Sequence, residues 1–198
     1  MSSHHFVKEG QEPALLILDA LSLELAEPFL EWAPLVMVTD TVLTTVLRWG
    51  IKIDVALVQI DGREEMKAEL VDQFPVEIIT YHNQNDLLSI AFNFLINRKQ
   101  KAVNVMTETS DSLFDIVNQF TQKIQVDVFD QNINWLCIHK GQYQKWLPAM
   151  SQLKIRIEVK QNIQFTGLTH DKEFWEAEKD GMVTIQSDQI FWVGELPE

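Results

Sequence analysis

Residues 76–97 read VEIITYHNQNDLLSIAFNFLIN, which is a short apolar run, then a polar turn, then an amphipathic stretch. The apolar run has the length of a buried strand, and positions 87, 88, 91, 94 and 95 place apolar side chains on one face of a helix. Another apolar run follows at 102–106. A strand, a helix and a second strand at this spacing predict a βαβ unit with parallel strands.

The same alternation extends over the first two thirds of the chain. Its strand-like runs are continuously apolar, which is typical of parallel strands that helices cover on both faces. Further strands are expected at 14–18, 35–38 and 54–58, and further helices at 22–29, 41–49, 64–73 and 112–123. The sequence therefore predicts an N-terminal α/β domain built on a parallel sheet.

The pattern changes near residue 125, where the expected strands are short and alternate apolar with polar residues. The clearest run, KIRIEVK at 154–160, alternates strictly and predicts a sheet with one face in water. Similar runs lie at 125–129, 134–139, 182–186 and 189–193, with turn signals such as Asp180-Gly181 between them. We expect a small antiparallel β-sandwich after the α/β domain.

Charge and composition exclude several classes of protein. The 198 residues include 16 Lys and Arg against 29 Asp and Glu, and this net charge of −13 argues against binding to nucleic acid or to anionic membranes. Hydrophobic residues make up 46% of the chain, enough for a sizeable core. The single cysteine, Cys137, is expected to be a core thiol. No apolar run approaches the roughly 18 residues of a membrane span and the start does not resemble a signal peptide, so we expect a cytoplasmic protein.

Polar residues follow the expected parallel strands at the point where each strand ends. Asp40, Asp61, the group 81–86 and the group 107–111 each occupy such a position. Carboxylates that converge on one edge of a sheet suit Mg²⁺, which in turn neutralises a polyphosphate. The alternative interpretation is that each acid caps the helix that follows it. Neither of the two common glycine-rich phosphate motifs occurs in the chain.

Several short elements resemble those of the thiamine pyrophosphokinase family. Phe165-Thr-Gly-Leu168 and the stretch 180–192 are similar to the glycine-containing turn and closing hairpin of the family's C-terminal part. Residues 38–40, 49–61 and 81–87 are similar to three acidic elements of its N-terminal part. The resemblance spans nearly the whole chain.

The resemblance implies a fold, an activity and a set of site residues. It implies a catalytic-like α/β domain at 1–124, a thiamine-binding-like β-sandwich at 125–198, and a homodimer formed through the β-sandwich. An active member would use ATP and Mg²⁺ to transfer pyrophosphate to thiamine. By the same resemblance, catalysis and metal binding are expected at Asp61 and Asp86, and cofactor contacts at Asp40, Asp54 and His82.

The chain departs from the family at positions that such a reaction needs. Thr41 and Val42 stand where the family has glycines, and Gln59 and Asn83 stand where it has acids. His82 stands where the family has a lysine. Pyrophosphoryl transfer depends on positioning and charge neutralisation. The leading hypothesis is therefore a thiamine pyrophosphokinase-like protein with weak or no kinase activity. If it is inactive, it needs no cofactor. An active kinase, and a non-catalytic module that senses a ligand or binds a partner, remain as alternatives.

Overall fold

The computed structural model describes residues 12–139, 141–157 and 163–196, and the chain divides into two units, Met1–Val126 and Asp127–Glu198. Each unit has its own hydrophobic core. Within the described ranges, no helix has the length and apolar character needed to cross a membrane. The assignment of a catalytic-like and a thiamine-binding-like role to domains 1–124 and 125–198 stays a prediction.

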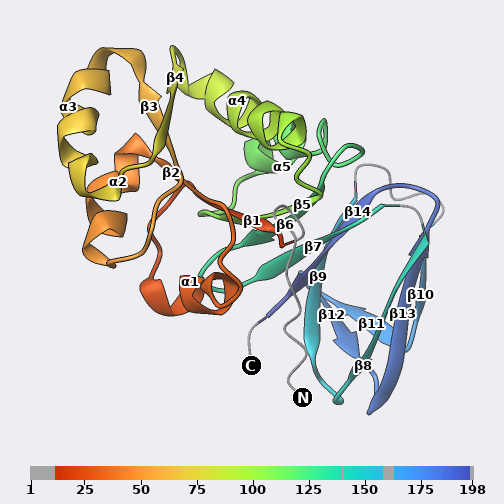
Figure 1. Cartoon of the computed structure of the whole chain (residues 1–198). Helices are drawn as coiled ribbons and strands as arrows, with labels where there is room; N and C mark the ends of the chain where they lie inside the picture. The colour runs from red at the N-terminus through yellow and green to blue at the C-terminus, as the bar shows by residue number, and fades with distance from the viewer. Residues whose placement is uncertain (1–11, 140, 158–162, 197–198) are drawn as a thin grey trace, which may run out of the picture. The chain divides into compact units, whose positions relative to one another are not determined.

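The first unit is built on a parallel sheet, as predicted (Figure 1). Neighbouring strands run in the order β5-β1-β2-β3-β4, and every pair is parallel. The strands are β1 (Ala14–Ile17), β2 (Val36–Thr39), β3 (Val55–Gln59), β4 (Glu77–Tyr81) and β5 (Ala102–Met106). Most residues of β1, β2 and β3 are buried, because helices cover the sheet. The uninterrupted apolar runs of the sequence reflect this double burial.

The helices of the first unit follow their strands closely. They are α1 (Leu23–Leu30), α2 (Asp40–Arg48), α3 (Arg63–Glu69), α4 (Gln84–Asn97) and α5 (Asp111–Val117), with single turns η1 (Ile60–Gly62) and η2 (Val71–Gln73). Ser22 and Ser110 cap α1 and α5 by accepting backbone hydrogen bonds. The helix predicted at 112–123 is shorter than expected. Beyond it the Thr121 hydroxyl donates to the Asn118 carbonyl, a local bond that competes with helical pairing.

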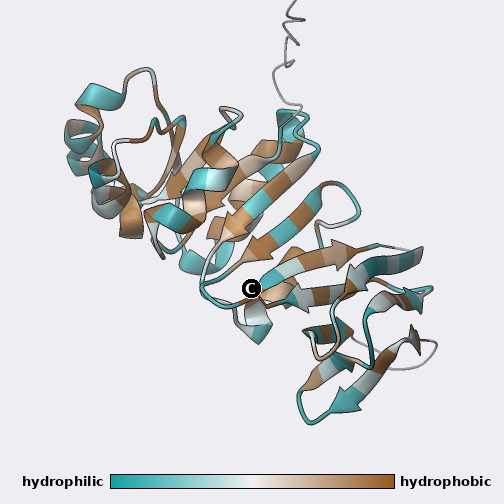
Figure 2. Cartoon of the chain, turned by 90° about the horizontal axis from the view of Figure 1, so that it is seen from below, coloured by the Kyte–Doolittle hydropathy of each residue, from teal (hydrophilic) through white to brown (hydrophobic). Residues whose placement is uncertain are grey.

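The second unit is a sandwich of two antiparallel sheets, as predicted. Strands β11-β12-β9-β14-β7-β6 neighbour one another in this order as part of an 11-stranded sheet, and β10-β13-β8 form a separate sheet. The strands are β6 (Gln125–Phe129), β7 (Asn134–Ile138), β8 (Gly141–Leu147), β9 (Gln152–Ile157), β10 (Ile163–Thr166), β11 (Leu168–Asp171), β12 (Phe174–Ala177), β13 (Gly181–Ser187) and β14 (Phe191–Glu195). Strand β6 spans the boundary between the units. Figure 2 shows polar and apolar residues alternating along strands of this kind.

Sequence patterns missed four strands of the sandwich, namely β8, β10, β11 and β12. Their residues, such as those of GQYQKWL, mix polar and large apolar side chains without a strict period. The strand predicted at 154–160 is β9 as far as Ile157, and 158–160 lie outside the described residues. Cys137 is a core thiol, as predicted: burial, and then the charge of Asp127, raises its pKa to about 12.

Candidate functional site

The carboxyl edge of the parallel sheet carries a connected set of polar side chains. Asp40 begins α2 directly after β2, and its carboxylate accepts two hydrogen bonds. The Gln59 backbone N–H donates to Oδ2 at 2.6 Å, and the Tyr81 hydroxyl donates to Oδ1 at 2.8 Å. Gln84 Nε2 in turn donates to the Tyr81 oxygen at 3.0 Å. Both oxygens of Asp40 therefore have partners within the chain.

Tyr81 is the least exposed member of this set. It lies at the end of β4 with 1% of its surface exposed. Burial, followed by the hydrogen bond to Asp40 and the charge of that carboxylate, raises the pKa of Tyr81 to about 12. The phenol consequently stays protonated at neutral pH and remains a donor to Asp40.

A second acid of this edge was missed by sequence reasoning. Asp19 follows β1, and its Oδ2 accepts bonds from the Thr107 hydroxyl at 2.7 Å and from the Glu108 N–H at 3.0 Å. Strands β1 to β4 follow one another across the sheet in one direction. The next strand, β5, pairs with the other side of β1, so the strand order reverses between β1 and β5. Open parallel sheets bind ligands at such a reversal. Here Asp19 joins the two strand ends, a role that its position directly after an apolar run could have indicated.

The other residues expected at this edge make fewer contacts. Asp61 is exposed in η1, and no polar partner of its side chain occurs among the described residues. Asp86, also exposed, accepts one bond from Asn83 Nδ2 at 3.3 Å in the first turn of α4. His82 is exposed after β4. Within the described part of the chain, no three His, Cys, Asp or Glu side chains gather closely enough to hold a metal ion.

Asp54 lies at the opposite, amino edge of the same sheet. It precedes β3, where its Oδ2 accepts the Val36 N–H at 3.0 Å and its Oδ1 accepts Lys52 Nζ at 2.6 Å. The hydrogen bond and the charge of Asp54 raise the pKa of Lys52. The structure therefore brings Asp40, Asp61 and the start of α4 to one edge, but it does not bring Asp54 there.

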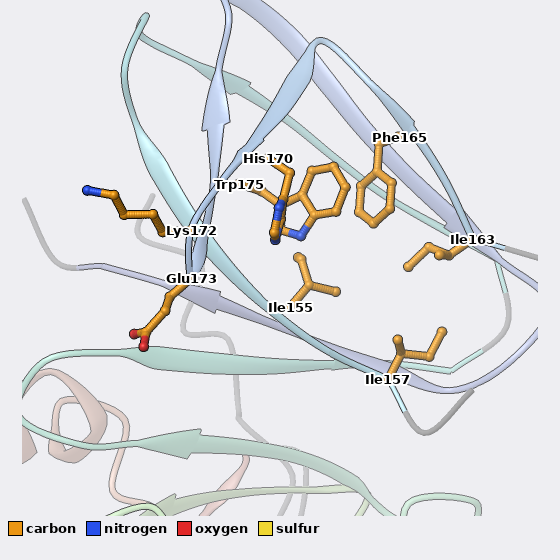
Figure 3. Close-up of a pocket in the computed structure, with 8 residues that line it drawn as sticks. All are labelled: Ile155, Ile157, Ile163, Phe165, His170, Lys172, Glu173 and Trp175. Carbon is orange, nitrogen blue, oxygen red and sulfur yellow. The ribbon is translucent and has the colours of Figure 1, made fainter. Parts of the chain in front are cut away.

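The second unit contains a cavity of about 560 Å³ that the sequence analysis did not anticipate (Figure 3). Its lining comes from β9, β10, β11, β12 and the turn between the last two: Ile155, Ile157, Ile163, Phe165, His170, Lys172, Glu173 and Trp175. The rings of Phe165 and Trp175 stack with centroids 3.5 Å apart and planes 13° apart. His170 meets Trp175 edge-on, with centroids 4.9 Å apart. Both rings of the stack are only partly buried.

Two backbone features shape this cavity. Gly167, which joins β10 to β11, has a φ of +72°, and a Cβ there would lie 3.3 Å from the Met182 carbonyl oxygen. Lys172 has a φ of 53° in the two-residue turn of the β11–β12 hairpin. Large side chains rarely adopt this conformation. The isoleucines, the aromatic stack and the charged turn together make a mostly apolar hollow with polar groups at one side, which suits a flat aromatic molecule.

The chain has the fold of several solved thiamine pyrophosphokinases, which confirms the predicted resemblance at the level of the fold. No protein-family model matches the sequence, and no curated protein matches it either. The thiamine pyrophosphokinase from Bacillus subtilis superposes with a TM-score of 0.67 at 12% identity, covering 93% of this chain and 99% of that one. That from Geobacillus thermodenitrificans gives 0.68 at 14% identity, with 93% and 98% covered. That from Candida albicans gives 0.61 at 11%, with 93% and 90% covered.

Proposed function

We propose that this chain, which shares the fold of the thiamine pyrophosphokinases, is a divergent relative that binds thiamine or a related flat aromatic molecule in the cavity of its second unit. We propose that it transfers pyrophosphate weakly or not at all. The observation that carries the binding is the wall of Phe165, Trp175 and His170 in an open apolar cavity. Partly exposed aromatic rings provide a ligand with both apolar surface to cover and stacking contacts.

The state of Asp40 supports the loss of transfer. A cation that approached this carboxylate would compete with the protons of Tyr81 and of the Gln59 backbone, which already lie against both oxygens. Asp19 is held in the same way by Thr107 and Glu108. Phosphoryl transfer needs charges that neutralise the phosphates, and at this edge Asp40 and Asp19 are already occupied by hydrogen-bond donors of the same chain.

An active kinase is the second candidate, and a specific observation favours it. Asp61 has no polar partner within the described ranges, and Asp86 has a single long bond, so both carboxylates are available. Mg²⁺ is commonly bound by one or two carboxylates together with substrate phosphates. These two acids would therefore bind the ion only together with the phosphates of ATP, while Asp40 and His82 would contact the nucleotide.

Melting temperatures distinguish the two candidates. A ligand that binds only the folded state raises the melting temperature. At a concentration one hundred times its dissociation constant, it adds about 2.7 kcal/mol to the free energy of unfolding. We expect thiamine to raise it and Mg²⁺-ATP to leave it unchanged, in the wild type and in Asp61→Asn alike. Asp72→Asn, which alters an exposed acid in η2, is the matched control. A shift with Mg²⁺-ATP that survives in Asp72→Asn and vanishes in Asp61→Asn would establish the kinase instead.

Product formation tests the second half of the proposal directly. The purified protein is incubated with ATP, Mg²⁺ and thiamine, and AMP and thiamine diphosphate are measured together. We expect little or no product above a sample without protein. Formation of both products in equal amounts, abolished by Asp61→Asn, contradicts the proposed loss of activity.

The proposal includes the expected setting of the protein, which is a cytoplasmic homodimer without nucleic-acid or membrane partners. The net charge of −13 supports the absence of nucleic acid and anionic lipid. A non-catalytic module that senses a ligand would show the same rise in melting temperature with thiamine. It differs from a weakly active enzyme only because it forms no product.

A further inference from the structure

The turn between β11 and β12 brings two opposite charges to one side of the cavity in the second unit. It consists of Lys172 and Glu173, and both residues line the cavity. Both are exposed, and neither side chain has a polar partner among the described residues. Figure 3 shows that the two side chains leave the turn in different directions. Each charge is therefore open to a bound molecule.

The rest of the described cavity lining carries no carboxylate and no ammonium or guanidinium group. It consists of isoleucines, the two stacked aromatic rings and His170. Strand β9 contributes Ile155 and Ile157, whereas its charged residues, Lys154 and Arg156, occupy the alternate positions and do not line the cavity. The turn therefore decides which charges a ligand meets.

The backbone of Lys172 is held in an unfavourable conformation. Its φ of 53° lies in the left-handed region, which glycine adopts freely and larger residues rarely adopt. Residues held in such conformations gather at binding sites. Since Lys172 makes no polar contact within the described part of the chain, nothing there offsets the strain through its ammonium group. A ligand that pairs with this group would do so.

We infer that the cavity takes a flat cationic heteroaromatic molecule with a phosphate arm, such as a phosphate ester of thiamine. The phosphate would pair with Lys172, and the cationic ring would have Glu173 as its counter-charge. This inference rests on the proposed binding of a flat aromatic molecule in the cavity, and it names the charges of that molecule. A simple cation would pair with Glu173 but bring a like charge toward Lys172, and a simple anion would do the reverse. Only a molecule with both charges pairs with both residues.

The chemistry of lysine favours phosphate as the anionic group. A lysine ammonium is a compact charge with three donors and binds phosphate as a point charge. A phosphate monoester carries about −1.5 to −2 charges at pH 7, so Lys172 attracts it more strongly than it attracts a carboxylate. Such an ester already carries a phosphate of the kind that a kinase would add. A preference for it therefore agrees with binding rather than with transfer.

The test compares thiamine with thiamine monophosphate by isothermal calorimetry on the full chain. We expect the wild type to bind the monophosphate about fivefold more tightly, which is the size of effect that an exposed ion pair gives. Lys172→Gln should remove this difference, and Lys172→Glu should reverse it. Lys179→Gln changes an exposed lysine of the same unit that does not line the cavity, so it is the matched control and should keep the preference.

A second variant tests the cationic half of the inference. Glu173→Gln should weaken the binding of both compounds by a similar factor and leave their ratio unchanged, because both carry the same cationic ring. Glu178→Gln, at an exposed acid outside the cavity lining, is its control and should leave both affinities unchanged. Both Lys172 and Glu173 are exposed, so we expect their variants to fold as the wild type does, which circular dichroism checks.

The outcomes separate this inference from the proposed function. Equal affinities in the wild type, or tighter binding of thiamine, would overturn the inference and leave the proposed binding of thiamine in place. A preference for the monophosphate that survives Lys172→Gln would overturn the pairing with Lys172, and unchanged affinities in Glu173→Gln would overturn the role of Glu173. If both compounds bind with dissociation constants above about 1 mM, the inference and the proposed binding are both wrong.

Discussion

The carboxyl edge of the parallel sheet and the cavity of the β unit differ in what their side chains contact. At the edge, Asp40 and Asp19 are bound by hydroxyl and backbone donors of the same chain. In the cavity, Phe165 and Trp175 stack on each other but remain partly exposed. A polar site that satisfies itself has little to gain from a ligand, whereas partly exposed apolar surface gains from being covered. This difference supports the proposed binding of a ligand in the β unit.

Alkaline pH tests the carboxyl edge most strongly, because Tyr81 donates to Asp40 there, whereas the chain's other tyrosine, Tyr143, lies in the second unit outside the cavity lining. The pKa of Tyr81 is raised from 10.0 to about 12, and burial together with Glu195 also raises the pKa of Tyr143. The folded protein therefore holds these protons more tightly than the unfolded chain. The contribution of Tyr81 to stability is complete below pH 10 and is lost as the pH rises through about 12.

The measurement is the ultraviolet absorbance of tyrosinate, recorded with circular dichroism during an alkaline titration. We expect no ionisation near pH 10 while the chain is folded, and Tyr81→Phe should lose less stability than the wild type between pH 10 and about 12. Ionisation near pH 10 in the folded protein that Tyr81→Phe abolishes would mean that the edge is open to water, and the proposed difference between the edge and the cavity would be wrong.

Replacing Trp175 with leucine should affect the cavity alone. The change removes the stack with Phe165 and the edge contact of His170, while an apolar side chain stays in place. Stacking on an aromatic side chain contributes about 1–3 kcal/mol, so we expect thiamine to bind roughly 10–100-fold more weakly by isothermal calorimetry. Trp32→Leu, at a 63% exposed tryptophan of the first unit, is the control and should bind thiamine as the wild type does.

Replacing Tyr81 with phenylalanine should affect the edge alone. Asp40 Oδ1 loses its donor and Gln84 loses its acceptor, so the free energy of unfolding should fall by about 1–2 kcal/mol in denaturant titrations. Thiamine affinity serves as the internal control and should not change. If Mg²⁺-ATP stabilises the variant but not the wild type, Tyr81 is what keeps the edge closed; a drop in thiamine affinity would contradict the separation of the two regions.

The smallest expected effect concerns the turn beside the cavity. Lys172→Gly removes a side chain from a residue with a φ of 53°, and glycine adopts this conformation freely. We expect a gain of about 0.5–1 kcal/mol, which corresponds to a rise of about 1–4 °C in the melting temperature. Lys179→Gly, at an exposed position without a positive φ, should instead lower it. Equal effects of the two changes would show that Lys172 carries no strain.

Much of the fold follows from local patterns in the sequence. Short apolar runs predicted β1 to β5 to within two residues, because burial on both faces leaves few polar positions in these strands. The positions of Asp40, Asp61 and Asp86 after their strands also followed, since parallel strands end at one edge. The four missed strands, β8, β10, β11 and β12, lack a clear period in the sequence because polar and large apolar residues share their exposed positions, as Gln142, Gln144 and Trp146 do in β8.

By itself the sequence determined the fold class, the core thiol Cys137 and which acids follow strands, because all three depend on residue order and local burial. Only the tertiary structure decided what those side chains contact. Asp40 meets Tyr81 across 41 positions of sequence, and Asp19 meets Thr107 across 88. Phe165 and Trp175 stack although their strands belong to different sheets, and Gly167 lies where the chain passes from one sheet to the other. Partners so distant in sequence are set by strand order and register, which no local pattern contains.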